Sequence, residues 1–206
     1  MSAEAVTTWF LELTAPDELR PAPVPAPAGG VRIVRAGEPS GEFGRFLYTA
    51  VGGDCSWTDR LAWPPERWQA HLERPGCEVW VAYRHGTPAG YMELDAQDGG
   101  AVEIVYFGLL PRSRGLGVGG HLLSYGAARA WDLAERQPGR PPTRRVWLHT
   151  CSLDGPYALP NYRRRGFRVT HSTVAGPVAG SAAPSVPPST PSAPPSATEA
   201  ESRHVG

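Results

Sequence analysis

The sequence predicts a single folded domain of the α/β or α+β class, and three observations support this prediction. Hydrophobic patterns of helical period and of strand period alternate along the middle of the chain. The most β-prone run is followed by a glycine-rich turn and then by a long helical stripe. Glycine and proline are concentrated at residues 21–30 and 176–195, which leaves roughly 150 residues for one domain with a real core.

The first half of the domain is expected to contain two helices and three strands. Phe43, Leu47 and Val51 have helical spacing, and a second helix begins at Pro64 or Pro65, where the missing N–H of proline carries no cost. Residues 85–88 have the composition of a turn, so the runs on either side of them form an antiparallel hairpin. The expected strands are residues 31–34, 78–84 and 89–94, and the second helix ends before residue 75.

The second half repeats the alternation. Residues 101–110 are the most β-rich run and are expected to form the central strand. A helical stripe runs from Leu122 to Leu133 and ends before Pro138. The remaining expected elements are a strand at 146–150, a helix at 157–165 capped by Gly166, and a last strand at 167–170.

The two ends are expected to lie outside this domain, which covers residues 31–170. Residues 1–30 are predicted to be an N-terminal arm and a Pro-rich linker, in which Thr7 to Thr14 adds an edge strand or packs on the surface. Residues 171–206 are rich in Ser, Ala and Pro and have almost no large apolar side chains, so a disordered tail is predicted.

Charge and cysteine content exclude several classes of function. The 20 basic and 20 acidic side chains balance, so no overall positive potential attracts nucleic acid, and no nucleic-acid partner is expected. No apolar run has the length of a membrane span and no secretory signal is apparent, so no membrane partner and a cytoplasmic location are expected. The cysteines Cys55, Cys77 and Cys151 are odd in number and widely spaced, so we expect free thiols and no metal site.

The glycine-rich turn, residues 114–119, is the strongest local signal. Its backbone N–H groups and the N-terminal end of the following helix form a site suited to a pyrophosphate, although such a turn is also a common structural connection. The chain contains no lysine, which excludes a Walker loop. A Rossmann fold is disfavoured because the turn follows a hairpin past the middle of the chain.

Two motifs in this order resemble the GNAT superfamily of acyl-CoA N-acyltransferases. The motifs are Arg114-x-x-Gly117-x-Gly119, which follows a strand, and Ala158-x-x-x-Tyr162-x-x-x-Gly166-Phe167. The resemblance covers residues 31–170, and the surrounding sequence resembles a bacterial subgroup of the superfamily. It implies a GNAT fold, with a central mixed, mostly antiparallel sheet, a splayed strand pair, and helices on both faces. It also implies acetyl-CoA as the co-substrate.

The resemblance assigns a role to each matching residue. The pantetheine of acetyl-CoA is expected along Phe107, Gly108 and Leu109, with the backbone N–H near Leu109 bonding the thioester carbonyl. Tyr162 is expected to protonate the departing thiolate. The pyrophosphate is expected on the amides of Arg114, Gly115, Leu116, Gly117, Val118 and Gly119.

The general base and the acceptor wall are less specific. Glu103 is the candidate base or an outward-facing carboxylate, and the strand period places it on one face with Val105 and Phe107. Tyr106 and His149 are reserve candidates for the base. The tryptophans and acids between the first two helices either bind a cationic amine or pack and face solvent; the candidate substrate residues are Asp54, Trp57, Asp59 and Tyr106.

Two further features remain open at this level. The run of arginines at residues 163–165 is either a solvated helix face or a partner for the ribose phosphate of CoA. Gly155 stands where the family often has a cofactor-contacting asparagine, seven positions before Tyr162.

The sequence thus predicts an N-acetyltransferase that transfers acetyl directly from acetyl-CoA to a primary amine of a small molecule or a peptide. The alternative is a catalytically silent GNAT domain that acts as an acyl-CoA sensor or interaction module. The exposed aromatic residues of the arm would permit a homodimer.

Overall fold

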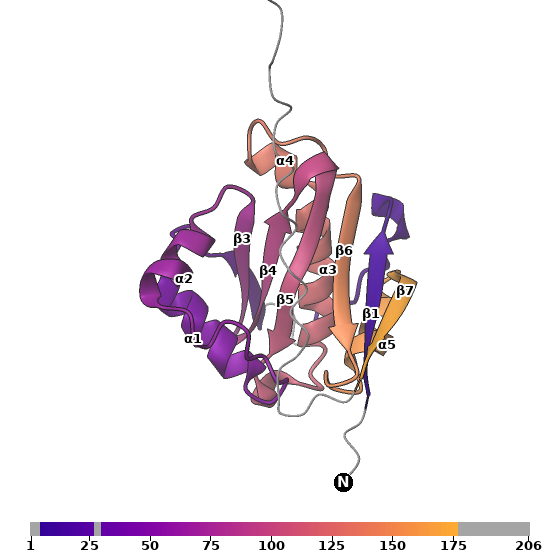
Figure 1. Ribbon diagram of the computed structural model, residues 1–206, viewed down its shortest axis with the longest axis horizontal. Coiled ribbons are helices and arrows are strands. Elements are labelled where there is room, and N and C mark those ends of the chain that lie inside the picture. The colour runs from indigo at the N-terminus through magenta and orange to yellow at the C-terminus, as the bar shows by residue number, and fades with distance from the viewer. Residues whose placement is uncertain (1–4, 27–29, 177–206) are drawn as a thin grey trace, which may run out of the picture.

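Seven strands form one mixed sheet in the computed structural model, which describes residues 5–26 and 30–176 (Figure 1). Their order is β2-β3-β4-β5-β6-β1-β7, and every neighbouring pair is antiparallel except β5 and β6. The strands are β1 Val6–Leu13, β2 Val31–Arg35, β3 Cys77–Arg84, β4 Thr87–Ala96, β5 Ala101–Leu109, β6 Arg145–Cys151 and β7 Arg168–Ala175. This arrangement confirms the predicted class, and β5 is the middle strand, as expected.

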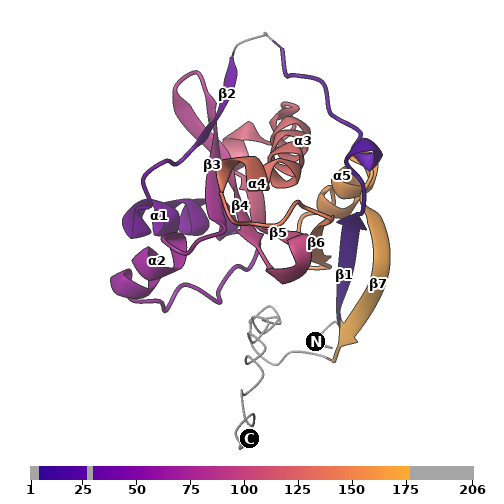
Figure 2. The same cartoon turned by 90° about the horizontal axis from the view of Figure 1, so that it is seen from above.

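Helices cover both faces of the sheet, as Figure 2 shows. On one face Leu47, Val51 and Leu72 of α1 and α2 pack on Val79 and Tyr91. On the other face α3 and α5 pack on the strands around Met92, Leu94 and Ile104. The helices are α1 Gly41–Gly52, α2 Pro65–Leu72, α3 Val118–Trp131, the short α4 Leu133–Arg136 and α5 Ala158–Arg164.

Local chemistry fixes the ends of these helices. The hydroxyl of Ser40 accepts the backbone N–H of Phe43 at 3.2 Å and caps α1. Pro65 occupies the first turn of α2, where a backbone N–H has no partner within the helix, so the N–H that proline lacks costs no hydrogen bond. Gly166 follows α5 with a φ of 98°, a left-handed conformation that suits glycine.

The N-terminal arm lies inside the sheet, which corrects the expectation of an edge strand or a surface segment. β1 pairs with β6 on one side and with β7 on the other. Leu11 and Leu13 have no exposed surface and belong to the core between the sheet and α5. The arm therefore supplies an interior strand to the domain that was expected to begin at residue 31.

The segment after β1 also packs on the domain. Arg20 N–H donates to the carbonyl of Arg165 at 3.0 Å, and Ala22 N–H donates to the Ser124 hydroxyl of α3 at 2.8 Å. Pro25 is buried beside Gly117. Residues 20–25, which we call the strap, therefore lie along α3.

β7 ends later than predicted. It continues to Ala175, five residues into the segment expected to be a disordered tail, because β1 offers a partner for its whole length. The rest of the predicted tail, from residue 177 onward, lies outside the described residues.

Two further observations concern the described part of the chain. Cys55, Cys77 and Cys151 are free thiols, as expected. None of the described helices is long and apolar enough to cross a membrane.

Candidate active site

A cleft opens where β5 and β6 part. The two strands pair only from Ala101 to Glu103 with Arg145 to Trp147, and Figure 1 shows them separating below this point. The cleft has a volume of about 1560 Å³ and is lined by both strands, the α1–α2 loop, the first turn of α3 and the start of α5. This is the splayed strand pair that the sequence predicts.

A β-bulge at Val105 decides which side chains of β5 face which way. The register with β4 shifts so that Glu93 pairs with Tyr106 and Leu94 pairs with Ile104. The prediction that Glu103, Val105 and Phe107 share one face is therefore wrong. The extra residue reverses the alternation, and Phe107 joins Ile104 in the core against α3, while Tyr106 packs on the side of α1.

The backbone of Leu109 points into the cleft. The N–H of Leu110 donates to Ala89 of β4 at 2.9 Å, and successive residues of a strand direct their backbone groups to opposite sides. The N–H and carbonyl of Leu109 therefore face away from β4, toward the gap. The guanidinium of Arg114 bonds the Leu109 carbonyl at 3.1 and 3.2 Å, which agrees with this direction.

The glycine turn begins α3 at the edge of the same cleft. Gly115 and Gly117 have φ values of 75° and 78°, so their backbone conformation favours glycine. Gly117 caps α3 without a side chain, which leaves the N–H groups of the first turn available. Gly119 lies against Leu109, since a Cβ added there would be 3.3 Å from Leu109 Cδ1.

Asp54 lies at the glycine turn and is paired. Its two oxygens accept from Arg114 at 2.6 and 2.8 Å, and both side chains are about half exposed. The hydrogen bonds and charge of Arg114 hold the pKa of Asp54 below its ordinary value. While this pair is intact, Asp54 is not free to bind an acceptor amine.

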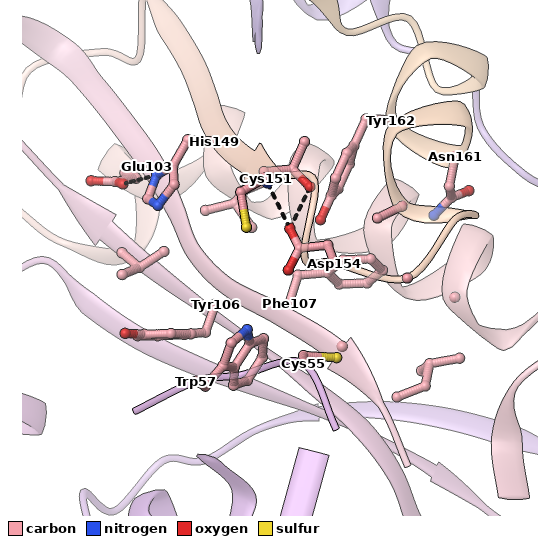
Figure 3. A pocket seen from close by; sticks show the side chains of 18 of the residues that line it. Cys55, Trp57, Glu103, Tyr106, Phe107, His149, Cys151, Asp154, Asn161 and Tyr162 are labelled. Atoms are coloured by element: carbon pink, nitrogen blue, oxygen red, sulfur yellow. Dashed lines mark hydrogen bonds and ion pairs between the residues drawn. The ribbon is translucent and has the colours of Figure 1, made fainter. Parts of the chain in front are cut away.

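Tyr162 belongs to α5 and lies at one end of the cleft, with its hydroxyl directed inward (Figure 3). Its side chain is buried, and burial together with the nearby charge of Asp154 raises its pKa well above the ordinary value. Asp154 itself is held by the Thr150 hydroxyl and by the N–H of Cys151, at 2.5 and 3.0 Å. The Tyr162 phenol is therefore protonated at neutral pH.

Glu103 belongs to a hydrogen-bonded group on the far side of the cleft from Tyr162. Gln97 donates to Glu103 Oε2 at 2.8 Å, and Gln97 in turn accepts from Trp147 at 3.0 Å. His149 Nδ1 lies 3.5 Å from Glu103 Oε1 (Figure 3). The carboxylate is thus directed toward His149 in the cleft, and the structure brings together the candidate base and one of its reserves.

Asp59 forms the opposite wall with aromatic side chains. Its oxygens accept from the hydroxyls of Tyr48 and Tyr106 at 2.7 and 2.5 Å. Trp57 packs edge-on against Tyr106, with their ring centroids 4.8 Å apart. Asp59, Trp57 and Tyr106 line the cleft, where the acceptor was expected, whereas Tyr48 is buried behind them.

The faces of two wall aromatics are already covered by the protein's own cations. The guanidinium of Arg60 lies 4.8 Å from the ring of Trp63 and 4.5 Å from that of Tyr106, and Arg67 lies 4.2 Å from the ring of Trp63. Trp68 is 1% exposed and belongs to the core. Carboxylates, rather than open aromatic faces, are therefore the groups at this wall that suit an ammonium.

One group of side chains has donor atoms close enough to hold a metal ion. His71, Cys77 and Glu93 bring their donor atoms within 4.8 Å of one another. Both oxygens of Glu93 already accept from Arg60, so a guanidinium occupies the position that a cation would take. Burial raises the pKa of the Cys77 thiol, which disfavours the thiolate that a metal needs. The donor set therefore suits an ion pair better than a metal.

The structure adds site residues that sequence reasoning missed. Gln97 follows β4 and bonds to Glu103, and Asp154 follows β6 and lines the cleft with Tyr162, whose pKa its charge helps to raise. Asn161 lines the cleft beside Gly120, and its place directly before Tyr162 was the available signal. The position of a Cβ on Gly155 is open, with no atom within 4 Å.

A sheet that parts beside a glycine turn, with a buried tyrosine across the gap, is the architecture of acyl-CoA-dependent transferases that the two motifs predicted. The model of the Acetyltransferase (GNAT) family matches residues 46–167, more than half of the chain. The chain therefore belongs to the GNAT acetyltransferase family. No curated protein matches it.

Solved structures share this fold at low sequence identity. A GCN5-related N-acetyltransferase from Kribbella flavida has a TM-score of 0.59 at 20% identity, covering 84% of this chain and 58% of its own. A protein of the same description from Sphaerobacter thermophilus has a TM-score of 0.58 at 19% identity, covering 82% and 50%. The chain thus spans little more than half the length of these two relatives.

A third structure is an aminoglycoside acetyltransferase from an uncultured soil metagenomic sample, in complex with sisomicin. Its TM-score is 0.53 at 16% identity, and the match covers 65% of this chain and 86% of the other. At these identities the likeness shows the fold alone.

Proposed function

We propose that this protein transfers the acetyl group of acetyl-CoA directly to a primary amine, with donor and acceptor bound together in the cleft. The observation that best supports the proposal is that Leu109, whose N–H faces away from β4, the glycine turn, Tyr162 and Glu103 all line one cleft. The aminoglycoside acetyltransferase among the similar folds is consistent with an amine acceptor.

The donor would lie along the end of β5 and the first turn of α3. The N–H groups of residues 115–119 and the positive end of α3 would bind the pyrophosphate. Pantetheine would fill the gap beside Phe107 and Leu109, where β5 has no strand partner on the β6 side. The Leu109 N–H would then stabilise the thioester oxygen as it gains negative charge.

Tyr162 and Glu103 would handle the protons. Glu103 would take a proton from the bound acceptor ammonium, directly or through His149, and the neutral amine would then attack the thioester carbonyl; both side chains line the cleft. The protonated phenol of Tyr162 would donate its hydrogen bond to the leaving sulfur and then supply the proton. A phenol is protonated throughout the neutral range, and burial raises the pKa of Tyr162 further above it.

The acceptor is expected between the Glu103 group and the wall formed by Asp59, Trp57 and Tyr106. Asp59 and Glu103 present negative charge there, which favours an amine that binds as an ammonium. Asp54 is paired with Arg114 at the donor end, so it is assigned no contact with the acceptor.

Calorimetric titration of acetyl-CoA and CoA tests the donor site. Gly117→Glu places a carboxylate at the pyrophosphate position, and Gly117→Gln has the same size and the same strain at positive φ without the charge. We expect the Glu variant to bind CoA at least about tenfold more weakly than the Gln variant. No binding of either ligand by the folded native protein would overturn the proposal.

Release of CoA with a panel of primary amines tests turnover. Tyr162→Phe is expected to lower kcat by about 10²–10⁴ while leaving acetyl-CoA affinity unchanged, because only the proton donor is lost. Tight CoA binding with no release for any amine would instead identify a silent binding domain.

A further inference from the structure

A guanidinium with no counter-charge among the described residues lies beside the glycine turn. Arg165 follows α5, and its Nη1 is 3.3 Å from the position that a Cβ on Gly120 would occupy. Asn161 Oδ1 lies 3.6 Å from the same point. Gly120 is in the first turn of α3, and Gly120 and Asn161 both line the cleft. Arg165 therefore borders the donor end of the cleft.

Arg165 differs from three of the arginines that line the cleft, and it shares with Arg67 and Arg164 the lack of an ion pair among the described residues. Arg60, Arg74 and Arg114 each pair with a carboxylate, whereas no described carboxylate lies within ion-pair distance of Arg165. Its side chain is half-buried, and its Nε is buried without a hydrogen-bond partner among the described residues. Burial, together with the charge of Arg164, lowers the pKa of Arg165. A bound anion would relieve both costs.

The neighbouring arginines divide into two kinds. Arg163 and Arg164 are both exposed, but only Arg164 lines the cleft. The strap fixes the position of Arg165, because Arg20 N–H bonds its carbonyl and Ala22 covers the adjacent side of Gly120. Arg165 is thus held next to the first turn of α3, and the exposed Arg164 adds a second cation at the edge of the cleft.

We propose that Arg165, assisted by Arg164, binds the 3′-phosphate on the ribose of CoA. The inference rests on the proposed function, which makes CoA the ligand. The backbone N–H groups of the glycine turn already serve the diphosphate, so the separate phosphomonoester dianion needs cations of its own just beyond that turn. An arginine fork suits this group because it offers two parallel donors to phosphate oxygens.

The consequence is selectivity for the 3′-phosphate. Native protein should bind CoA about tenfold more tightly than 3′-dephospho-CoA, the value expected for one charge-assisted contact. Calorimetric titration with these two compounds tests it in the native protein and in the Arg165→Gln variant. The variant should lose the discrimination, so that CoA affinity falls about tenfold while dephospho-CoA affinity does not change.

Arg163→Gln is the matched control, because it removes the same charge from an exposed neighbour that does not line the cleft and should keep the tenfold ratio. If Arg165→Gln does not fold, as judged by thermal unfolding, Arg164→Gln and Arg165→Lys provide the test. Arg164→Gln should lower the ratio of CoA affinity to dephospho-CoA affinity by several fold, and Arg165→Lys should retain part of this ratio.

Two outcomes would overturn the assignment. In the first, Arg165→Gln weakens the binding of CoA and of dephospho-CoA equally, which would place Arg165 at the diphosphate or in a structural role. In the second, it weakens the binding of neither compound. Failure of the proposed function has a different signature, namely that native protein binds neither compound. The two failures are therefore distinguishable.

Discussion

Glu93 illustrates, at the scale of single residues, how a buried charge is retained in this fold. Its side chain is 2% exposed and accepts from Arg60 at 2.8 and 3.0 Å, while His71 Nε2 lies 2.8 Å from Oε1. Burial alone would raise the pKa of Glu93, but Arg60 and His71 lower it to about 2. Since this value is below the ordinary 4.5, the pair stabilises the fold fully above about pH 4.5, and this stability is lost as pH falls toward 2.

Glu93→Gln is expected to lower the free energy of unfolding at pH 7 by about 3–5 kcal/mol, because Arg60 stays buried without its counter-charge. The difference from native protein should shrink as pH falls from about 4.5 toward 2, where native Glu93 takes up a proton. Urea unfolding at pH 7 and pH 3 measures both effects. Glu66→Gln, at an exposed position of α2, should change stability by less than about 0.5 kcal/mol. Equal stability of native protein and the Glu93 variant at pH 7 would contradict the argument.

Some site residues could be predicted from sequence because local motifs contain them. Tyr162 lies four residues before Gly166, and the turn at residues 114–119 contains its own glycines, so each signal is contained in a short stretch of sequence. Gln97 could not be predicted, because its role depends on a contact with Glu103. The sequence offered residues 163–165 together as possible partners of the ribose phosphate, and only the position beside Gly120 distinguishes Arg165. The roles of Glu103 and Tyr162 themselves stay predictions.

One extra residue in β5 has the largest effect at the scale of elements. The period of two places Phe107 with Glu103, whereas the bulge at Val105 moves Phe107 to the α3 side and gives Tyr106 the cleft side next to Asp59. A bulge has no periodic signature, so the period of two located the strand but assigned Phe107 to the wrong face. Helices such as α1 and α3 were predictable because their apolar faces repeat at helical spacing.

Gly166 joins α5 to β7 and is tightly enclosed. A Cβ there would lie 2.0 Å from the carbonyl oxygen of Glu18, and its φ is 98°. Gly166→Ala should therefore lower the free energy of unfolding by about 2–3 kcal/mol through strain and displacement of the segment at Glu18. Thermal unfolding measures the change. Gly155→Ala, where no atom lies within 4 Å, should be neutral; a neutral Gly166→Ala would show that the contact at Glu18 yields freely.

The insertion of β1 between β6 and β7 organises the whole molecule. Phe10 of β1 stands opposite His149 of β6 and His171 of β7, and its ring stacks on that of His171 with centroids 4.3 Å apart. Nothing in the sequence of residues 6–13 indicated this interior position, because a short alternating run suits an edge strand equally well.

Deletion of residues 1–13 is expected to abolish cooperative unfolding, because it removes an interior strand and leaves the edges of β6 and β7 unpaired. Circular dichroism during a thermal scan measures the loss. A synthetic peptide covering residues 5–14 should restore part of the transition, whereas a peptide of the same composition in scrambled order should not. A cooperative transition at the native temperature in the deleted chain would contradict this expectation.

The position of β1 also sets an order of events during synthesis. Thr7 of β1 contacts Ser152, 145 residues later, and Phe10 contacts Thr170, 160 residues later. β1 is therefore synthesised long before β6 and β7, so this strand must remain unpaired while the hairpin of β3 and β4 assembles from neighbouring residues. We expect pairing of β1 to be a late step of folding, so that the side of the cleft formed by β6 becomes complete only after β6 and β7 have been synthesised.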